Sequence, residues 1–555
     1  MQHVSSSSPH HNRRRWRPAL GCTVALLLAP WIWLDPGQRA VWGNSLALFA
    51  GTTLIAVPIS LSVALLAQRW RVRGSTTVAA LLASALLIPL YAYVAGWDAA
   101  WNAWLSWRSQ GGGQLPPEIT SPASLGMAAA IGVHALAAVP WSLAIAWWGL
   151  ANLPSSMEDQ LRLDRPPLWV IFRYTLPRLE LTLWTMALLV LLTTFNEITV
   201  TDYYQVRTFS EELYVGFATQ PDLGGIVLQV LPGVLGIAAA VAVLAHSWLY
   251  EPSAADVRLG ERRAGQGAWS GPSDPRFRWL GSIWIWAVAF LVLGWPLMAL
   301  IFQAGVEQVA DDSARRMIWS PGLVVQRCAT ALSNNGSELL FSLGLSQLVA
   351  AGCLLTAGPL AWWARLRTTW RRAVPLTLVA AALAIPGPLL GLAVIRWLDR
   401  PGHSALNFLY DRTLFPLWLV HTIRCWPWAW LVLAAAFKSI PDSLVDQSRL
   451  DGFSSARSYV RWVVPLTFST QAASWFLVTG LSLNELSSSI LVAPPGYTPF
   501  SVAFFSTLHY GTRYELASLC LVVWGLAWGL AGLGWWNGSY RSRPARVQGD
   551  GRPVY

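Results

Sequence analysis

The chain has 555 residues, of which 54% are hydrophobic and only 12% are charged. Because soluble domains carry about 25% charged residues, this composition excludes a disordered chain and indicates that most of the length lies in lipid. The net charge of +11 comes almost entirely from arginines in short segments between apolar runs, which is typical of membrane topology and argues against nucleic-acid binding.

Twelve apolar stretches are long enough to cross about 30 Å of hydrocarbon as helices. They lie near residues 18–35, 43–68, 76–97, 123–150, 179–200, 225–249, 279–303, 338–363, 373–398, 413–436, 467–492 and 514–537. We therefore predict an all-α polytopic membrane protein with about 12 transmembrane helices.

The positive charges predict how these helices are oriented, because cytoplasmic loops retain Arg and Lys. With the amino terminus inside, 28 of the 39 Lys and Arg residues fall on the inner side. This asymmetry predicts an even number of crossings with both termini in the cytoplasm. The arginines at 13–17 could also open a cleavable signal peptide, but no small-residue cleavage site closes the following apolar run, which favours an uncleaved helix.

The two parts of the chain carry an internal repeat. Residues 133–164 align without a gap on residues 420–451, and the likeness resumes further along and upstream at slightly different offsets. The matched pairs are His134 with His421, Pro140-Trp141 with Pro427-Trp428, Asp159–Asp164 with Asp446–Asp451, Asn196-Glu197 with Asn484-Glu485, and Ile88-Pro89 with Ile385-Pro386.

Six crossings separate equivalent points of the repeat, so the two halves have the same orientation. We predict two parallel six-helix repeats related by a pseudo-twofold axis along the membrane normal. The predicted segments are a first permease half at 1–250, a cytoplasmic linker at 251–278, a second half at 279–540 and a cytoplasmic tail at 541–555.

The cytoplasmic loop between the fourth and fifth helix of each half is about 25 residues long and repeats Asp-Gln-x-Arg-Leu-Asp. A loop that only tethers two helices is usually shorter. We predict a short helix in each copy, at 154–165 and 441–452. Gly452 suits a left-handed closing position. In the first copy Arg165 stands there instead, and Pro166-Pro167 ends the helix by steric restriction.

These loops resemble the EAA loop of the inner-membrane permeases of binding-protein-dependent ABC importers. The family pattern is Glu-Ala-Ala, three residues, Gly, and later an apolar residue, one more, and Leu-Pro. The second copy resembles it at Asp446-Gln447-Ser448, Gly452 and Pro465, and the first at Asp159-Gln160-Leu161 and Leu176-Pro177. The first copy departs from the pattern at Arg165. The fused arrangement of two halves most resembles the ferric-iron and thiamine permease group.

The resemblance implies a transport subunit of the bacterial inner membrane, not an enzyme. Its implied partners are two copies of an ATP-binding cassette ATPase, an external solute-binding protein and membrane lipid. Ferric iron is the implied solute, with thiamine or another small solute as the alternative. The residues implied to couple to the ATPases are Asp159, Gln160, Arg162, Asp164, Asp446, Gln447, Arg449, Asp451 and Gly452.

The residues themselves support a separate ATPase. A phosphate-binding Gly-x-x-x-x-Gly-Lys loop needs a lysine, and the only lysine, Lys438, follows Ala-Ala-Ala-Phe. The sequence therefore contains no such loop, and two coupling loops imply two ATPase copies. The five cysteines are scattered without metal-ligand spacing, so we predict neither a metal site nor a cofactor.

Three charged residues inside or near predicted spans are candidate pathway residues, because a charge in the bilayer is costly. Glu197 and Glu485 lie near the far end of the fifth helix of each half. The alternative for both is hydrogen bonding with their neighbours Asn196 and Asn484. Arg424 has no charged counterpart in the first half, and it either faces the pathway or pairs with an acidic neighbour.

His134 and His421 are matched by the repeat and could be offered as metal ligands. Each stands alone on its helix, and a single imidazole makes a poor metal site. Helix packing is the favoured interpretation.

Two other functional classes remain open. An ion-coupled secondary carrier would also have twelve helices and parallel repeats, but the long duplicated loops disfavour it. A membrane-embedded transferase would need clustered carboxylates or a His/Asp constellation at one face. The acidic residues at 202, 211, 212, 311 and 312 are external and have no repeat counterpart.

Overall fold

The structure is a computed structural model that describes residue 21 and residues 35–110, 126–153, 155–219, 223–250, 275–311, 314–365, 369–494 and 496–541. All of the predicted first span at 18–35 except residues 21 and 35, most of the predicted linker and all but the first residue of the predicted tail lie outside these residues.

The first half of the described chain contains helices of very different lengths. They are α3 (Pro36–Gln68), α4 (Ser75–Ser84), η1 (Ala85–Leu87), α5 (Leu90–Gln110), α6 (Gly126–Ala151), α7 (Ser155–Asp164), α8 (Pro167–Val170), the π-helical η4 (Ile171–Thr175), α9 (Leu176–Arg178), α10 (Glu180–Asn196), α11 (Thr199–Tyr203), α12 (Phe209–Thr219) and α13 (Leu223–Tyr250).

The second half adds helices and one hairpin. Its elements are α15 (Pro275–Ala289), the π-helical η5 (Phe290–Gly294), α16 (Trp295–Gly305), β1 (Val306–Asp311), β2 (Ala314–Trp319), α17 (Pro321–Asn334), α18 (Gly336–Ala364), α19 (Thr369–Ala384), α20 (Gly387–Leu398), α21 (Ser404–Arg412), α22 (Phe415–Lys438), α23 (Asp442–Leu450), α24 (Ser455–Ser458), the π-helical η6 (Tyr459–Val463), α25 (Val464–Leu466), α26 (Phe468–Leu483), α27 (Ser489–Val492), α28 (Phe500–Tyr510) and α29 (Arg513–Arg541).

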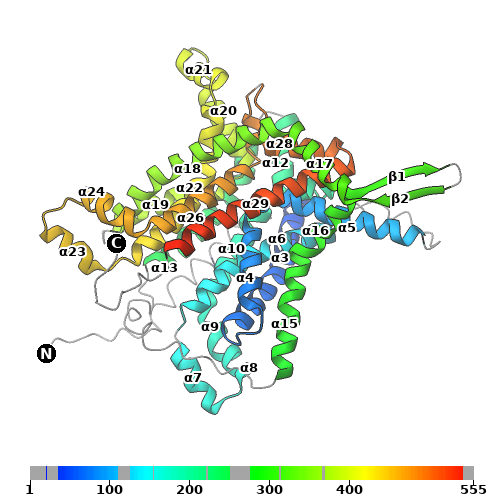
Figure 1. The fold of residues 1–555 in the computed structure, drawn as a ribbon. Helices are drawn as coiled ribbons and strands as arrows, with labels where there is room; N and C mark the ends of the chain where they lie inside the picture. Colours follow the sequence, from blue (N-terminus) through cyan, green and yellow to red (C-terminus); the bar gives the residue numbers. More distant parts are fainter. Residues whose placement is uncertain are drawn as a thin grey trace, which may run out of the picture.

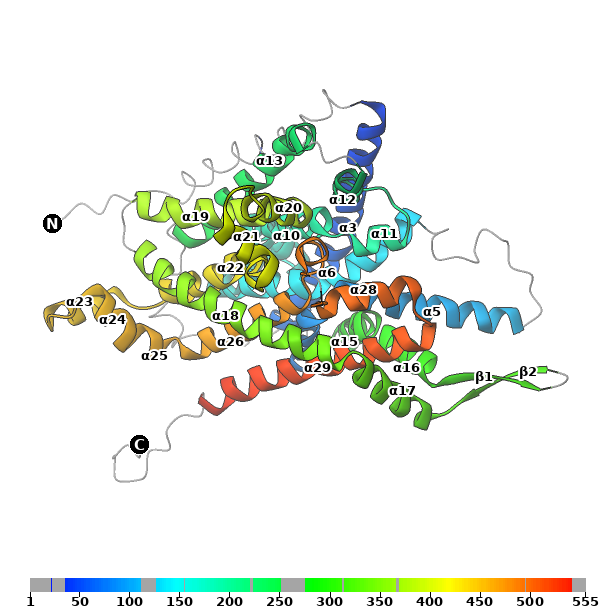
Figure 2. The same cartoon turned by 90° about the horizontal axis from the view of Figure 1, so that it is seen from above.

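The described helices confirm an all-α polytopic membrane protein. Six helices are long and apolar enough to cross a membrane, and up to ten crossings result if each of four sharply bent helix pairs is one span. The exception to the helical prediction is the antiparallel pair β1–β2, which begins with Val306 opposite Trp319. The hairpin projects from the helix body at the end opposite α23 and α24 (Figure 2).

Two predicted spans are broken at the repeated Ile-Pro pairs. The chain bends by 110° between η1 and α5 and by 107° between α19 and α20. Proline lacks a backbone donor and disfavours the α conformation in the residue before it, and Ile88 is accordingly extended. The expectation of continuous helices at 76–97 and 373–398 was therefore wrong, and Ile88-Pro89 and Ile385-Pro386 mark the breaks.

The order of elements from α3 to α13 recurs from α18 to α29. Both copies contain a long first helix, a bent pair, a fourth helix, a short polar helix and then a π-helical turn. These π-helical turns begin at Ile171 and Tyr459. The repeat found in the sequence is thus also present in the secondary structure (Figure 1).

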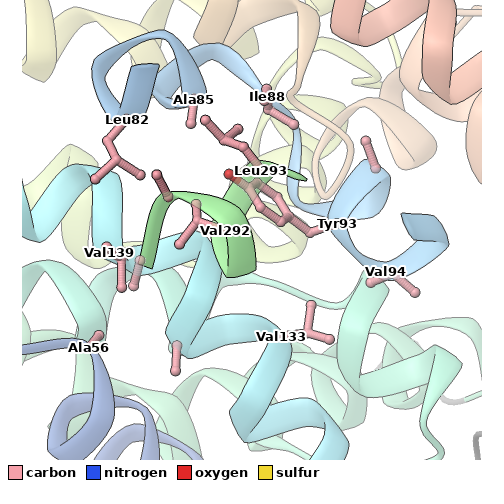
Figure 3. Packing of buried hydrophobic residues seen from close by; sticks show 14 of the residues in the cluster. Ala56, Leu82, Ala85, Ile88, Tyr93, Val94, Val133, Val139, Val292 and Leu293 are labelled. Atoms are coloured by element: carbon pink, nitrogen blue, oxygen red, sulfur yellow. The ribbon is translucent and has the colours of Figure 1, made fainter. Parts of the chain in front are cut away.

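The hydrophobic core joins the halves. One buried cluster combines first-half residues such as Leu82 and Tyr93 with Val292 and Leu293 of η5, which lie close together in Figure 3. A second cluster combines Trp42 and residues of α10 and α13 with residues of α18, α19 and α22. Each cluster draws on both halves of the chain, so van der Waals packing between membrane helices holds the halves together.

Candidate functional site

The two predicted short helices exist and project from the helix body. They are α7 and α23, which lie on the side away from α21 and the hairpin β1–β2 (Figure 1). Pro154, the predicted start of the first helix, lies outside the described residues.

The end of α23 has the predicted glycine conformation. Gly452 has a φ of +78°, which only glycine adopts readily. The Gly452 N–H donates to the Arg449 carbonyl at 3.0 Å, and the Phe453 N–H donates to the Ser448 carbonyl at 3.0 Å. These two bonds form a Schellman motif. The first copy ends differently, as predicted: α7 stops at Asp164, and Pro166-Pro167 follows in extended and then helical conformation.

Most of the predicted coupling residues are at the surface. Asp159 and Arg162 are half-buried. The exposed ones are Gln160, Asp164, Asp446, Gln447, Arg449, Asp451 and Gly452. Partial burial lowers the pKa of Arg162 to about 10, against the opposing effect of Glu158 and Asp159, so the side chain stays cationic at neutral pH. Asp446 and Arg449 pair at 3.2 Å on the exposed face of α23, a contact that contributes little to stability.

Two leucines on these polar helices are strongly exposed. Leu163 is 85% exposed and Leu450 is 89% exposed, and the repeat matches the two positions. The repeat thus places a large apolar side chain at the same exposed position in both copies. The sequence reasoning overlooked both residues, although the leucine is part of the repeated hexapeptide.

A buried ion pair anchors α7 to α3. Arg69 Nε lies 2.7 Å from Glu158 Oε2, and Glu158 is 1% exposed. Thr175 Oγ1 donates to the second carboxylate oxygen at 2.9 Å. Arg69 also donates to the Leu150 carbonyl at 3.0 Å. The helix is therefore fixed at one point to the end of α3, the end of α6 and the turn η4.

The second copy anchors α23 with different chemistry. Val445 occupies the repeat position of Glu158 and packs against the second hydrophobic cluster. Ser448 Oγ and Ser458 Oγ are 2.7 Å apart. Arg365, which follows α18 as Arg69 follows α3, donates to Asp442 at 2.9 Å and to the Ile440 carbonyl. Both halves thus use an arginine as the anchor. Its carboxylate partner is Glu158 in the first half and Asp442, which is not the repeat match of Glu158, in the second.

The candidate pathway carboxylates lie where the fifth helix of each half breaks. Glu197 accepts hydrogen bonds from the backbone N–H groups of Thr199 at 2.6 Å and Val200 at 3.0 Å. Glu485 accepts one from the Ser488 N–H at 3.2 Å. Both carboxylates therefore cap the helical turn that follows the break, as an N-cap aspartate does.

Arg424 pairs with an acidic neighbour and also reaches the other half. Its Nε donates to Glu485 Oε2 at 3.3 Å. Its terminal nitrogen lies 3.5 Å from Asn196 Oδ1 and 3.2 Å from the Ile385 carbonyl. The first half has no such pair, because Ala137 stands at the repeat position of Arg424. Glu197 Oε2 instead lies 3.7 Å from Nε2 of His134, the repeat match of His421.

The contacts of the two asparagines are reciprocal between the halves. Asn196 lines a small cavity together with Ala384 and Pro386, at the bend between α19 and α20 in the second half. The Asn484 side chain donates to the Leu87 carbonyl at 3.3 Å, beside the bend between η1 and α5 in the first half. The repeat had matched the two Ile-Pro pairs with each other and the two Asn-Glu pairs with each other. The structure brings each asparagine next to the Ile-Pro pair of the opposite half, at the interface between the halves.

A further contact joins the halves near α28. His509 Nε2 donates to Asp202 Oδ2 at 2.9 Å, while Nδ1 lies 3.0 Å from the Phe505 carbonyl. Both neighbours can accept hydrogen bonds, so this arrangement favours the protonated imidazolium, which donates from both nitrogens. The hydrogen bond to Asp202 accordingly raises the pKa of His509.

The side chains of His134 and His421 are both buried in the interior of the protein. His421 makes hydrogen bonds with Ser482 at 2.9 Å and Ser489 at 2.7 Å, as the packing interpretation predicts. In the part of the chain that the structure describes, no group of three or more His, Cys, Asp or Glu residues is placed to hold a metal ion.

Comparison with known proteins gives a partial match. No family model matches the chain. The chain is 23% identical over 172 residues to the putrescine transport system permease protein PotI of Escherichia coli strain K12, and to the same protein of Escherichia coli O6:H1. The match covers 31% of this chain and 60% of the relative's length. The similarity supports the general prediction of a transport permease with several membrane crossings.

Proposed function

We propose that the chain is the transmembrane permease of an ATP-driven ABC importer, and that α7 and α23 each dock on one copy of a separate ATPase. The observation that carries the proposal is the duplicated polar helix. It occurs at the same repeat position in both halves, it carries an exposed leucine in its last two residues both times, and an arginine anchors it each time to the membrane helices.

Alternating access is the proposed mechanism. Closure of the two ATPases on ATP moves α7 and α23, and the anchoring residues pass this movement to α3 and α18 because Arg69 and Arg365 follow these helices directly. The interface between the halves, which the contact of Arg424 with Asn196 crosses, then rearranges. Glu197, Glu485 and Arg424 are the proposed pathway residues, and an external solute-binding protein delivers the solute.

The proposed location is the bacterial inner membrane with both termini in the cytoplasm, and the proposed segments are those predicted from the sequence. The proposed solute is ferric iron, since the fused halves resemble that permease group, with thiamine as an alternative. Similarity to a putrescine permease makes a polyamine a further candidate. Capture of the cognate binding protein and identification of its ligand would decide among them.

The docking proposal predicts that Asp159→Lys combined with Asp446→Lys releases the ATPase. A lysine in place of each aspartate reverses the charge at both contacts, and like charges across an interface cost several kcal/mol. We expect co-purified ATPase to fall by at least about tenfold, since 1.4 kcal/mol corresponds to that factor.

The matched control is Asp399→Lys with Asp411→Lys, which makes the same change at two exposed sites, one at the end of α20 and one within α21. This control should retain the ATPase. Undiminished ATPase binding in the Asp159/Asp446 variant would count against the docking assignment. Solute uptake that persists after ATP depletion would favour the ion-coupled carrier.

A further inference from the structure

Two tryptophans that the repeat matches lie against each other. Trp141 of α6 and Trp428 of α22 have ring centroids 5.7 Å apart at an interplanar angle of 50°. A twofold operation exchanges matched residues, so their midpoint lies on the axis. Matched residues in mutual contact therefore lie beside the pseudo-twofold axis between the halves.

Each of these tryptophans directly follows a proline inside its helix. Pro140 lies inside the continuous helix α6, and Pro427 lies inside the continuous helix α22. Proline removes a backbone hydrogen bond and clashes with the preceding turn, so it is a common point of bending in membrane helices. The two helices can therefore bend immediately beside the aromatic contact.

The tryptophan contact adjoins the polar contact between the halves. Arg424 precedes Trp428 by four residues, so both lie on the same face of α22. That face reaches the first half at Asn196 through Arg424 and at Trp141 through Trp428. Neither tryptophan is fully buried. An aromatic layer thus follows a polar layer along the axis, one helical turn closer to α23.

We propose that Trp141 and Trp428 form the constriction of the solute pathway, closed when the rings touch and opened by bending at Pro140 and Pro427. The inference rests on the proposed transport function, because a solute that crosses between two rocking halves passes along the axis that relates them. Two apposed indole rings exclude water and small polar solutes from that line.

A leak measurement tests the constriction without ATP-driven transport. The complete transporter complex is reconstituted in liposomes that contain radiolabelled mannitol, with no ATP. Trp141→Ala with Trp428→Ala should raise mannitol release over that of the wild type by on the order of tenfold, because the barrier along the axis is lowered. Trp141→Phe with Trp428→Phe keeps two rings and should leak far less.

The matched control removes a different tryptophan pair. Trp148 and Trp248 have ring centroids 4.0 Å apart, but both lie in the first half and the repeat does not relate them. Trp148→Ala with Trp248→Ala should leave mannitol release unchanged. Equal release from both alanine variants, or no increase from the Trp141/Trp428 variant, would overturn the proposal.

A second measurement separates this inference from the proposed function. In a chain whose native cysteines are replaced, Trp141→Cys with Trp428→Cys is joined by a short, reducible bifunctional thiol reagent. We expect cross-linking to stop ATP-driven solute uptake and reduction to restore it. A cross-linked protein that transports at the uncross-linked rate would overturn the constriction but leave the importer proposal standing. If the wild type shows no ATP-driven uptake, the importer proposal fails and the mannitol comparison decides the constriction.

Discussion

Glu158→Gln is expected to lower the free energy of unfolding by about 3 kcal/mol, because it removes one partner of a buried ion pair and leaves the other charge uncompensated. The affected partner is Arg69, which lies 2.7 Å from the carboxylate. Since the same pair ties α7 to α3, ATP-driven uptake should fall together with stability. Denaturant unfolding of the purified protein and uptake by reconstituted complexes measure the two effects.

The second half of the chain suggests the rescue for this variant. Val445 stands at the position of Glu158 and anchors α23 by apolar packing. Replacement of a buried ion pair by apolar residues of similar volume is often neutral or stabilising. Arg69→Met with Glu158→Val should therefore be close to the wild type in stability. Asp164→Asn, which changes an exposed carboxylate on the same helix, is the matched control for the stability measurement. A Glu158→Gln protein as stable as the wild type would contradict the anchoring role.

Arg424→Met is expected to cost about as much, roughly 3 kcal/mol, because Glu485 then keeps its charge at the half-to-half interface without a cation. Their distance of 3.3 Å and their low exposure, 15% for Arg424 and 11% for Glu485, support this estimate. Arg424→Met combined with Glu485→Gln removes both charges and should recover most of the stability. Thermal unfolding of the detergent-solubilised protein compares the three forms.

The same pair of variants separates a structural role from a pathway role. If Arg424 acts on the solute pathway, the stable double variant still loses solute uptake. Uptake at the wild-type rate in that variant would show that Arg424 and Glu485 only stabilise the interface. Arg396→Met, which removes an exposed arginine of the same half, should affect neither stability nor uptake.

Much of the fold follows from hydropathy and the repeat. Long apolar runs predicted the membrane helices because lipid requires the backbone to bond within each segment. The short helices α7 and α23 and their ends were predictable as well, since the conformations available to Gly452 and to Pro166-Pro167 are restricted locally. Such features depend only on residues that are close together in the chain, so a single sequence is enough to predict them.

Other features depend on residues far apart in the chain. The ion pair between Arg69 and Glu158 was not predicted. The repeat matches Glu158 with Val445, an apolar residue, so the comparison of the two halves did not mark Glu158 as a charged anchor. The hairpin β1–β2 is a charged segment that follows an apolar helix, and no repeat counterpart marks it as structured. The breaks at Ile88-Pro89 and Ile385-Pro386 were visible as motifs, but their effect on the spans was not inferred.

The polar residues at the interface illustrate a similar limit. Glu197 and Glu485 were singled out because charges in a bilayer are costly, and the structure places both at helix breaks where they cap the next turn. The contact of Arg424 with Asn196 joins residues 228 positions apart. The contact between Trp141 and Trp428 likewise needed the packed structure, although the repeat had already matched the two residues.

The most direct test of the central claim is photo-cross-linking in intact cells from a photoreactive amino acid at position 163 and, separately, at position 450. Docking of α7 and α23 on two ATPases predicts a cross-link from each position to an ATP-binding subunit, and none from position 510 near the contact between His509 and Asp202. Cross-links from 163 and 450 to lipid or to an external protein, with no ATP-binding subunit among the products, would contradict it.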